Sequence, residues 1–164
     1  MSSEVPQSSH GVRDGDTGPT LRAAALILTR RGLLLVRQRR LERTYWLLPG
    51  GGVQFGETVA GALRRELLEE LHLEIVPGRP LALAEAISDD MARYPKHVVH
   101  VIVEARLADD ASQPRLGGDD AVLEARFVAR DELPELTLTP PITSFLDACF
   151  DAPPPTMEYL GVVW

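Results

Sequence analysis

Three glutamates lie close together in the sequence, at positions 66, 69 and 70. The surrounding segment, 58–71, is rich in Ala, Leu, Arg and Glu, a composition that favours a helix. On a helix, Glu66 lies one turn from both Glu69 and Glu70, so the three carboxylates share one face. Like charges at this spacing destabilise a helix by roughly 0.2–0.5 kcal/mol per pair, whereas a hard cation would bind them. The cluster therefore indicates a metal site or, alternatively, a solvated acidic face.

The residues before this cluster narrow the choice. A run of three glycines, 50–52, precedes Glu57, and Arg65 follows eight positions after Glu57. The spacing resembles the signature of the Nudix hydrolase family, G-x5-E-x7-R-E-U-x-E-E-x-G-U, where U is a bulky apolar residue. The matching residues are Gly51, Glu57, Arg65, Glu66, Leu67, Glu69, Glu70 and Leu73. We call this segment, residues 51–73, the box. The resemblance extends over most of residues 21–150, which we take as the domain.

One residue departs from the signature. His72 stands where the family has its last glycine, just past the predicted helix. A positive φ is common at that place, and histidine tolerates it better than β-branched residues do. We therefore expect a small stability cost at His72 and no effect on the chemistry.

The resemblance implies hydrolysis of a nucleoside diphosphate linked to another group, with Mg²⁺ or Mn²⁺ as cofactor. Glu66, Glu69 and Glu70 match the family's metal-binding glutamates, and Gly50 matches the residue whose backbone carbonyl joins them. Glu57 and Arg65 match the positions that brace the loop against the helix. We expect these two residues to orient the metal-binding groups.

Other positions of the resemblance are less specific. The general base is either a glutamate of the box or an acidic residue on a distant loop. The distant candidates are Asp119, Asp120 and Glu124, and we choose Asp120 among them. The arginines before the box could hold a phosphate, and Arg40 is taken as their representative. Tyr94 is the candidate for stacking on a base. The remaining candidates are expected to be structural: Trp46 in the core, and His97 and His100 on a strand.

Three other functions are weighed against a Nudix hydrolase. An isomerase of prenyl diphosphates shares the fold but needs a catalytic cysteine, and Cys149 lies far from the box in sequence. A non-catalytic Nudix-like module that binds or senses nucleotides would usually have lost box glutamates, which are intact here. An RNA-decapping enzyme would favour a basic groove, which a net charge of −7 does not suggest.

These residues need a scaffold of strands and two helices. Short apolar segments predict strands at 21–29, 33–37, 73–76, 81–87, 97–107 and 121–129. A helix is expected at 58–71 with Thr58 as N-cap, and a second at 140–150 with Thr139 as cap. Residues 37–44 are expected to be a charged loop and 50–52 a turn. The order of these strands and helices favours an α+β fold, and with the resemblance it predicts a Nudix-type α/β/α sandwich with a mixed β-sheet.

Length and composition set the remaining limits. The 164 residues, 45% of them hydrophobic, suit one domain at 21–150 with a flexible tail at 1–20 and an extension at 151–164. No apolar run approaches membrane-spanning length, and neither a signal core nor a disulfide framework is found, so a cytoplasmic protein is expected. The negative charge argues against a DNA partner, and the resemblance implies a small nucleotide-type substrate. The apolar C-terminus is expected to pack on the domain or on a second subunit of a homodimer.

Overall fold

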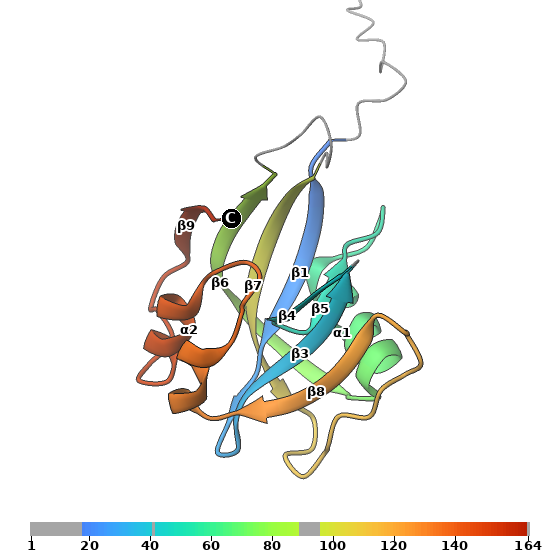
Figure 1. The fold of residues 1–164 in the computed structure, drawn as a ribbon. Coiled ribbons are helices and arrows are strands. Elements are labelled where there is room, and N and C mark those ends of the chain that lie inside the picture. Colours follow the sequence, from blue (N-terminus) through green and yellow to red (C-terminus); the bar gives the residue numbers. More distant parts are fainter. Residues whose placement is uncertain (1–17, 41, 89–95, 164) are drawn as a thin grey trace, which may run out of the picture.

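In the computed structural model, residues 18–40, 42–88 and 96–163 are described. They form the elements drawn in Figure 1. The strands are β1 (Thr20–Leu26), β2 (Leu28–Thr29), β3 (Gly32–Arg40), β4 (Arg43–Leu47), β5 (Gly50–Gly52), β6 (Ile75–Ile87), β7 (His97–Leu107), β8 (Val122–Val128) and β9 (Glu158–Val162). The helices are α1 (Val59–Leu71), the 3₁₀ helix η1 (Arg130–Glu135) and α2 (Thr143–Cys149).

The strands form two sheets. The larger has the order β5-β1-β7-β6-β9, and it is mixed, because β1 pairs in parallel with β7 and β6 with β9 while the other two pairs are antiparallel. In the smaller sheet, β3 pairs antiparallel with β2, β4 and β8. The strand predicted at 97–107 is β7, and it lies in the middle of the larger sheet.

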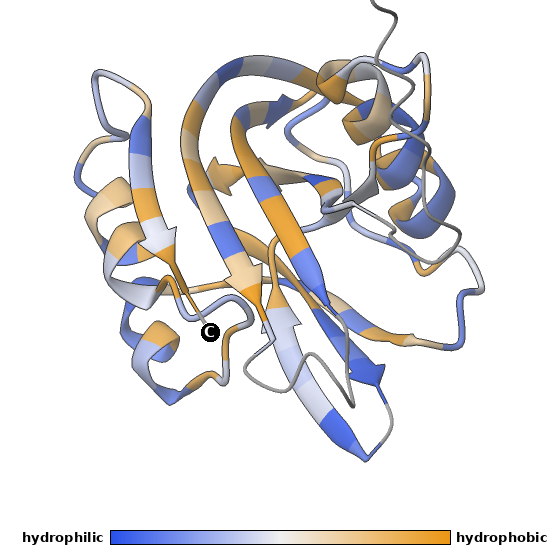
Figure 2. Ribbon diagram, turned by 90° about the horizontal axis from the view of Figure 1, so that it is seen from above, coloured by the Kyte–Doolittle hydropathy of each residue, from blue (hydrophilic) through white to orange (hydrophobic). Residues whose placement is uncertain are grey.

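Alternating side chains of β1 divide the interior into two cores. Ala23 and Ala25 belong to the core that α1 covers, whereas Ala24 and Leu26 belong to the core closed by η1 and α2. The two helical layers thus lie on opposite sides of the larger sheet (Figure 1). Figure 2 shows hydrophobic segments along the strands in the interior and hydrophilic segments on the outer face of the helices. The predicted α+β sandwich with a mixed sheet is confirmed.

The first helix forms as its sequence predicts. The Thr58 hydroxyl accepts a hydrogen bond from the Gly61 N–H at 3.0 Å, so Thr58 is the N-cap. His72 ends the helix in the left-handed region, with φ 53° and ψ 37°, and the expected positive φ is confirmed. Its backbone N–H donates to the Leu68 carbonyl at 3.1 Å, and the Nδ1 atom of its ring lies 3.1 Å from the Arg115 carbonyl.

Several local predictions are wrong where pairing with distant residues decides the structure. Residues 50–52 are the strand β5 instead of a turn, because they pair with β1. The charged segment 37–44 is largely a hairpin, since β3 runs to Arg40 and β4 begins at Arg43. The two strands predicted between 73 and 87 are one irregular strand, β6, which pairs along β7.

The second helix starts later than predicted, at Thr143, and Ile142 replaces Thr139 at its N-cap. Residues 137–139 are extended instead, because the Trp46 N–H donates to the Thr137 carbonyl and the Thr139 N–H donates to the Trp46 carbonyl, both at 2.8 Å. At the C-terminus, β9 adds to the edge of the larger sheet beside β6, which confirms that this segment packs on the domain. No helix among the described residues is long and apolar enough to cross a membrane.

Candidate active site

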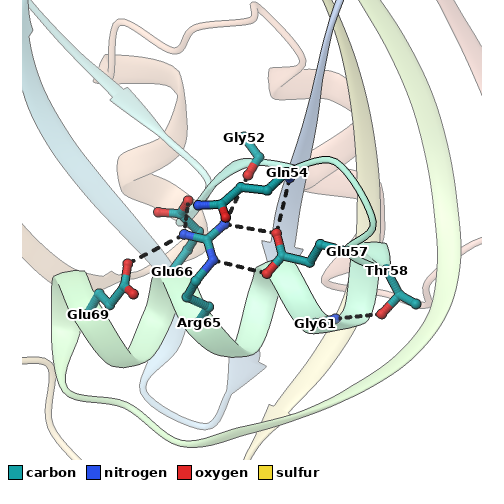
Figure 3. A network of polar contacts seen from close by, with 8 residues as sticks. All are labelled: Gly52, Gln54, Glu57, Thr58, Gly61, Arg65, Glu66 and Glu69. Carbon is teal, nitrogen blue, oxygen red and sulfur yellow. Dashed lines mark hydrogen bonds and ion pairs between the residues drawn. The ribbon is translucent and has the colours of Figure 1, made fainter.

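Arg65 is the centre of a polar network between α1 and the preceding loop (Figure 3). Its Nε and Nη2 atoms donate to the two carboxylate oxygens of Glu57 at 2.9 and 3.0 Å. Nη2 also donates to the Gly52 carbonyl at 3.1 Å, and Nη1 donates to Glu66 Oε1 at 2.7 Å and to Glu69 Oε2 at 3.4 Å. One guanidinium group therefore joins β5, the loop and two of the three clustered carboxylates.

The loop end of this network is held by Glu57. Its Oε2 atom accepts from the Gln54 N–H at 3.1 Å, and its own N–H donates to the Gln54 carbonyl at 3.0 Å. The hydrogen bonds that Glu57 accepts from Arg65 and then from Gln54 hold its pKa below the usual value. The hydrogen bonds that Arg65 donates to Glu57 and Glu66 raise the pKa of Arg65. Both groups are therefore charged at neutral pH.

Close backbone approach explains two of the glycines of β5. A Cβ on Gly51 would lie 2.5 Å from Glu66 Oε2 and closer still to the carboxyl carbon, so only glycine lets that carboxylate lie against the strand. Gly50 has φ 137°, and a Cβ there would collide with the Ala23 carbonyl. The Gly50 carbonyl accepts a hydrogen bond from Arg22 Nη2 at 2.8 Å.

Glu70 is a half-buried carboxylate of the cluster. Burial, and then the charge of Glu66, raise its pKa to about 7, with smaller effects from Asp119 and Glu69, while Arg22 acts in the opposite direction. Like-charged groups held together in this way are stabilised by a bound cation.

The loop after β7 contacts the end of α1, and the charge of Asp119 on this loop acts on Glu70. The Gly117 N–H donates to the Glu70 carbonyl at 2.7 Å, and the Arg115 N–H donates to the Leu71 carbonyl at 2.9 Å, so the loop satisfies carbonyls at the end of α1. A Cβ on Gly117 would collide with the Glu69 carbonyl. This contact depends on a glycine about 50 positions away from the helix, and sequence analysis missed it.

A family model described as the NUDIX domain matches residues 19–149. The chain belongs to the Nudix hydrolase family. Members of the Nudix family generally use a divalent metal and act on nucleoside diphosphate derivatives.

Related proteins agree with this membership. A MutT Nudix hydrolase from Burkholderia pseudomallei is 27% identical, with a TM-score of 0.66 over 80% of this chain and 98% of that one. A Nudix hydrolase from Nitrosomonas europaea shares the fold, with a TM-score of 0.68 at 20% identity over 82% of this chain and 90% of that one. A Mycobacterium tuberculosis protein named as a candidate 8-oxo-dGTP diphosphatase is 51% identical over 47 residues. That match spans 29% of this chain and 31% of the relative.

The donor set of the Nudix helix suits Mg²⁺ or Mn²⁺, which take carboxylate and carbonyl oxygens. Within the described ranges, no three acidic, histidine or cysteine side chains form a closed metal cage. Arg65 contacts Glu66 and Glu69 instead, but the side chain of Glu69 is 61% exposed and its contact is long. Glu69 can therefore turn toward Glu66 and Glu70, and the residues fit a divalent cation.

The other predicted site residues are less closely connected to the carboxylates. Asp119 and Asp120 are both exposed, and Asp119 Oδ1 accepts from the Ala121 N–H at 2.9 Å. Glu124 forms an ion pair with Arg37 at 3.1 Å, which occupies it. Arg40 is exposed at the end of β3. Tyr94 lies outside the described residues.

The three residues predicted to be structural are buried or contact other residues of the sheets. Trp46 is 9% exposed in the core closed by η1 and α2, with the guanidinium groups of Arg37 and Arg126 near its ring. His97 Nε2 lies 3.1 Å from Glu85 Oε2, and His100 is buried. Sequence analysis missed Arg22, whose guanidinium group also donates to the Leu48 carbonyl at 3.3 Å. An arginine at the start of an apolar strand carried no signal for this contact.

Proposed function

We propose that this chain is a metal-dependent pyrophosphohydrolase that cleaves a nucleoside diphosphate linked to another group. The observation that carries the proposal is the Arg65 network, which fixes the glycine strand and the loop against the helix that bears the three carboxylates. In the reaction, water adds to one phosphorus and the P–O–P bond breaks, so that two phosphate products leave.

The chain's own residues divide the work. Glu66, Glu69, Glu70 and the Gly50 carbonyl would hold Mg²⁺ or Mn²⁺. The cation, when bound, supplies positive charge that neutralises the pyrophosphate and polarises its phosphorus–oxygen bonds. Arg65 fixes the carboxylate of Glu66 beside Gly51. Glu57 in turn holds the guanidinium plane of Arg65, as an orienting partner does in a metal site.

The general base remains part of the proposal. We retain Asp120 as our choice, with Asp119 as its direct competitor because the charge of Asp119 acts on Glu70. Replacing each aspartate singly by asparagine separates the two. The base variant loses much of its kcat, whereas the other variant keeps it.

Arg40 and Tyr94 complete the proposal as substrate-binding residues, with a nucleotide-type small molecule as substrate. We also propose a domain at 21–150, a tail at 1–20, an extension at 151–164 and a cytoplasmic location. A homodimer is supported by Tyr159 and Val162, which are exposed on β9 at the edge of the larger sheet. Sedimentation of the purified chain tests the dimer.

The test of function is a panel of nucleoside diphosphate derivatives assayed with Mg²⁺ and with Mn²⁺. We expect hydrolysis with release of two phosphate products, loss of turnover with a chelator and recovery when metal is restored. Turnover that persists in the metal-free protein would overturn the metal-dependent mechanism. Tight binding of nucleotides without any hydrolysis would instead make the chain a nucleotide-binding module.

A further inference from the structure

The last turn of α1 carries two of the three clustered carboxylates. Glu69 and Glu70 are among the last residues of the helix, which ends at Leu71. The final carbonyl groups of a helix have no N–H partner within it, so this turn opens more easily than the middle of the helix. The His72 N–H pairs with the Leu68 carbonyl, which leaves the carbonyls of Glu69, Glu70 and Leu71 to be paired from outside the helix. The position of two metal-binding carboxylates therefore depends on what holds this turn.

The loop between β7 and β8 holds the turn through its backbone. The Gly117 N–H donates to the Glu70 carbonyl at 2.7 Å, and the Arg115 N–H donates to the Leu71 carbonyl at 2.9 Å. A Cβ on Gly117 would collide with the Glu69 carbonyl. Gly117 thus lies against the backbone of both Glu69 and Glu70, at a distance that only glycine permits.

The loop is itself fixed at both ends. At its start, the guanidinium group of Arg31 donates to the Ser112 carbonyl at 2.9 and 3.0 Å and to the Asp110 carbonyl at 2.9 Å. At its end, the Val122 N–H donates to the Asp119 carbonyl at 3.0 Å, where the chain enters β8. Figure 1 shows the loop passing beside α1 on its way to β8, which pairs with β3. The loop therefore connects the end of α1 to the smaller sheet and can restrain it.

The other contacts of this region do not replace Gly117. Arg65 acts on side chains, and its contact with Glu69 is long, at 3.4 Å. The His72 ring lies 3.1 Å from the Arg115 carbonyl, two residues before Gly117, and does not contact the backbone of the glutamates through this bond. Burial of the Leu71 side chain holds the turn to the core but supplies no donor for its carbonyls.

We propose that Gly117 is a positioning residue of the metal site, which holds the last turn of α1 in the conformation in which Glu69 and Glu70 bind the cation. It acts through the backbone of the two glutamates and not by contact with the metal. This inference rests on the proposed function, because it concerns the metal-binding groups of that same site.

Gly117→Ala tests the inference by metal binding. The colliding groups both belong to the main chain, so no side chain can rotate away and the loop must separate from the helix. Loss of groups that orient metal ligands typically costs about 10- to 100-fold in metal affinity. We expect the Kd for Mn²⁺, measured from the electron paramagnetic resonance signal of the free ion, to rise by about 10-fold or more.

Leu116→Ala is the matched control. Leu116 precedes Gly117 in the same loop and its side chain is exposed, so shortening it leaves the backbone contacts of Gly117 in place. Its Kd for Mn²⁺ should stay within about threefold of the wild-type value, and thermal unfolding shows whether both variants are folded. A folded Gly117→Ala that binds Mn²⁺ as tightly as the wild type would overturn the inference.

Hydrogen exchange of the wild type gives a test that does not depend on the folding of a variant. Coupling is reciprocal, so if the Gly117 contact strengthens metal binding about 10-fold, bound metal must stabilise that contact by the same factor. Saturating Mg²⁺ should therefore slow exchange of the Gly117 amide by about 10-fold. The Ser112 amide, which donates to the Asp109 carbonyl at 3.0 Å within the same loop, is the control and should not change. Exchange of the Gly117 amide at one rate with and without Mg²⁺ would also refute the inference.

Neither measurement needs turnover, so the inference and the proposed function can fail separately. Weaker Mn²⁺ binding by Gly117→Ala, in a protein that hydrolyses no compound of the panel, supports the inference and refutes only the catalytic proposal. Hydrolysis by the wild type, combined with equal metal affinity of the wild type and Gly117→Ala, refutes the inference alone. A wild type that binds neither Mn²⁺ nor Mg²⁺ refutes the metal site, and the inference with it.

Discussion

Replacing Gly51 by alanine tests whether the carboxylate of Glu66 must lie against β5. The new Cβ would be 2.5 Å from Glu66 Oε2, whereas an ordinary contact is about 3.5 Å. The Glu66 side chain is the flexible partner, so it moves by about 1 Å or more and the backbone keeps its place. Its 2.7 Å contact with Arg65 is then lost or lengthened.

The expected effects on stability and on activity differ in size. Loss of a partly exposed ion pair costs about 0–1 kcal/mol, and an alanine in place of a strand glycine returns about 0.4–1 kcal/mol through the unfolded state. The free energy of unfolding should therefore change by less than about 1 kcal/mol. A displacement of about 1 Å at a catalytic group costs on the order of 10²-fold in rate.

Gly52→Ala is the matched control. Gly52 is the next residue of the same strand, and a Cβ there meets nothing within 4 Å. Steady-state kinetics with Mn²⁺ and thermal unfolding should show a slow, stable Gly51→Ala and a Gly52→Ala close to the wild type. Equal activity of the two variants would show that the position of Glu66 does not matter for turnover.

Three further results are expected. Glu69→Gln or Glu70→Gln should lower kcat by about 10²–10⁴ without unfolding the protein, and a change below threefold in both would make the cluster a solvated surface. His72→Gly should relieve the strain of a left-handed backbone but lose the ring contact with the Arg115 carbonyl. The free energy of unfolding should therefore change by no more than about 1 kcal/mol, with turnover unchanged. A large loss of activity at the same melting temperature would place His72 at the substrate. Folding lowers the pKa of His100 from 6.5 to about 4, so as the pH falls the imidazole is protonated in the unfolded chain before it is protonated in the folded protein. The wild type should therefore lose up to about 3 kcal/mol of stability between pH 6.5 and pH 4. Denaturant titrations should show a smaller loss for His100→Gln over that interval, and parallel curves would contradict the assignment.

The sequence alone determined the features that depend on neighbours in the chain. The extent of α1 followed from helix formers and from Thr58 as its cap, and these act within one turn. The shared face of the three glutamates followed from helical spacing. The left-handed backbone of His72 followed from its place just past the last turn.

Only the tertiary structure decided the features that depend on distant partners. The glycine run became β5 because β1 offers it hydrogen bonds, and residues 137–139 became extended because β4 does. Arg22 was brought beside His100 by the pairing of β1 with β7. Gly117 was brought onto α1 by a loop whose composition shows no such contact. Hydrogen bonding and packing across the sheets fix these pairs, and no local pattern of residues encodes which partner a strand will meet.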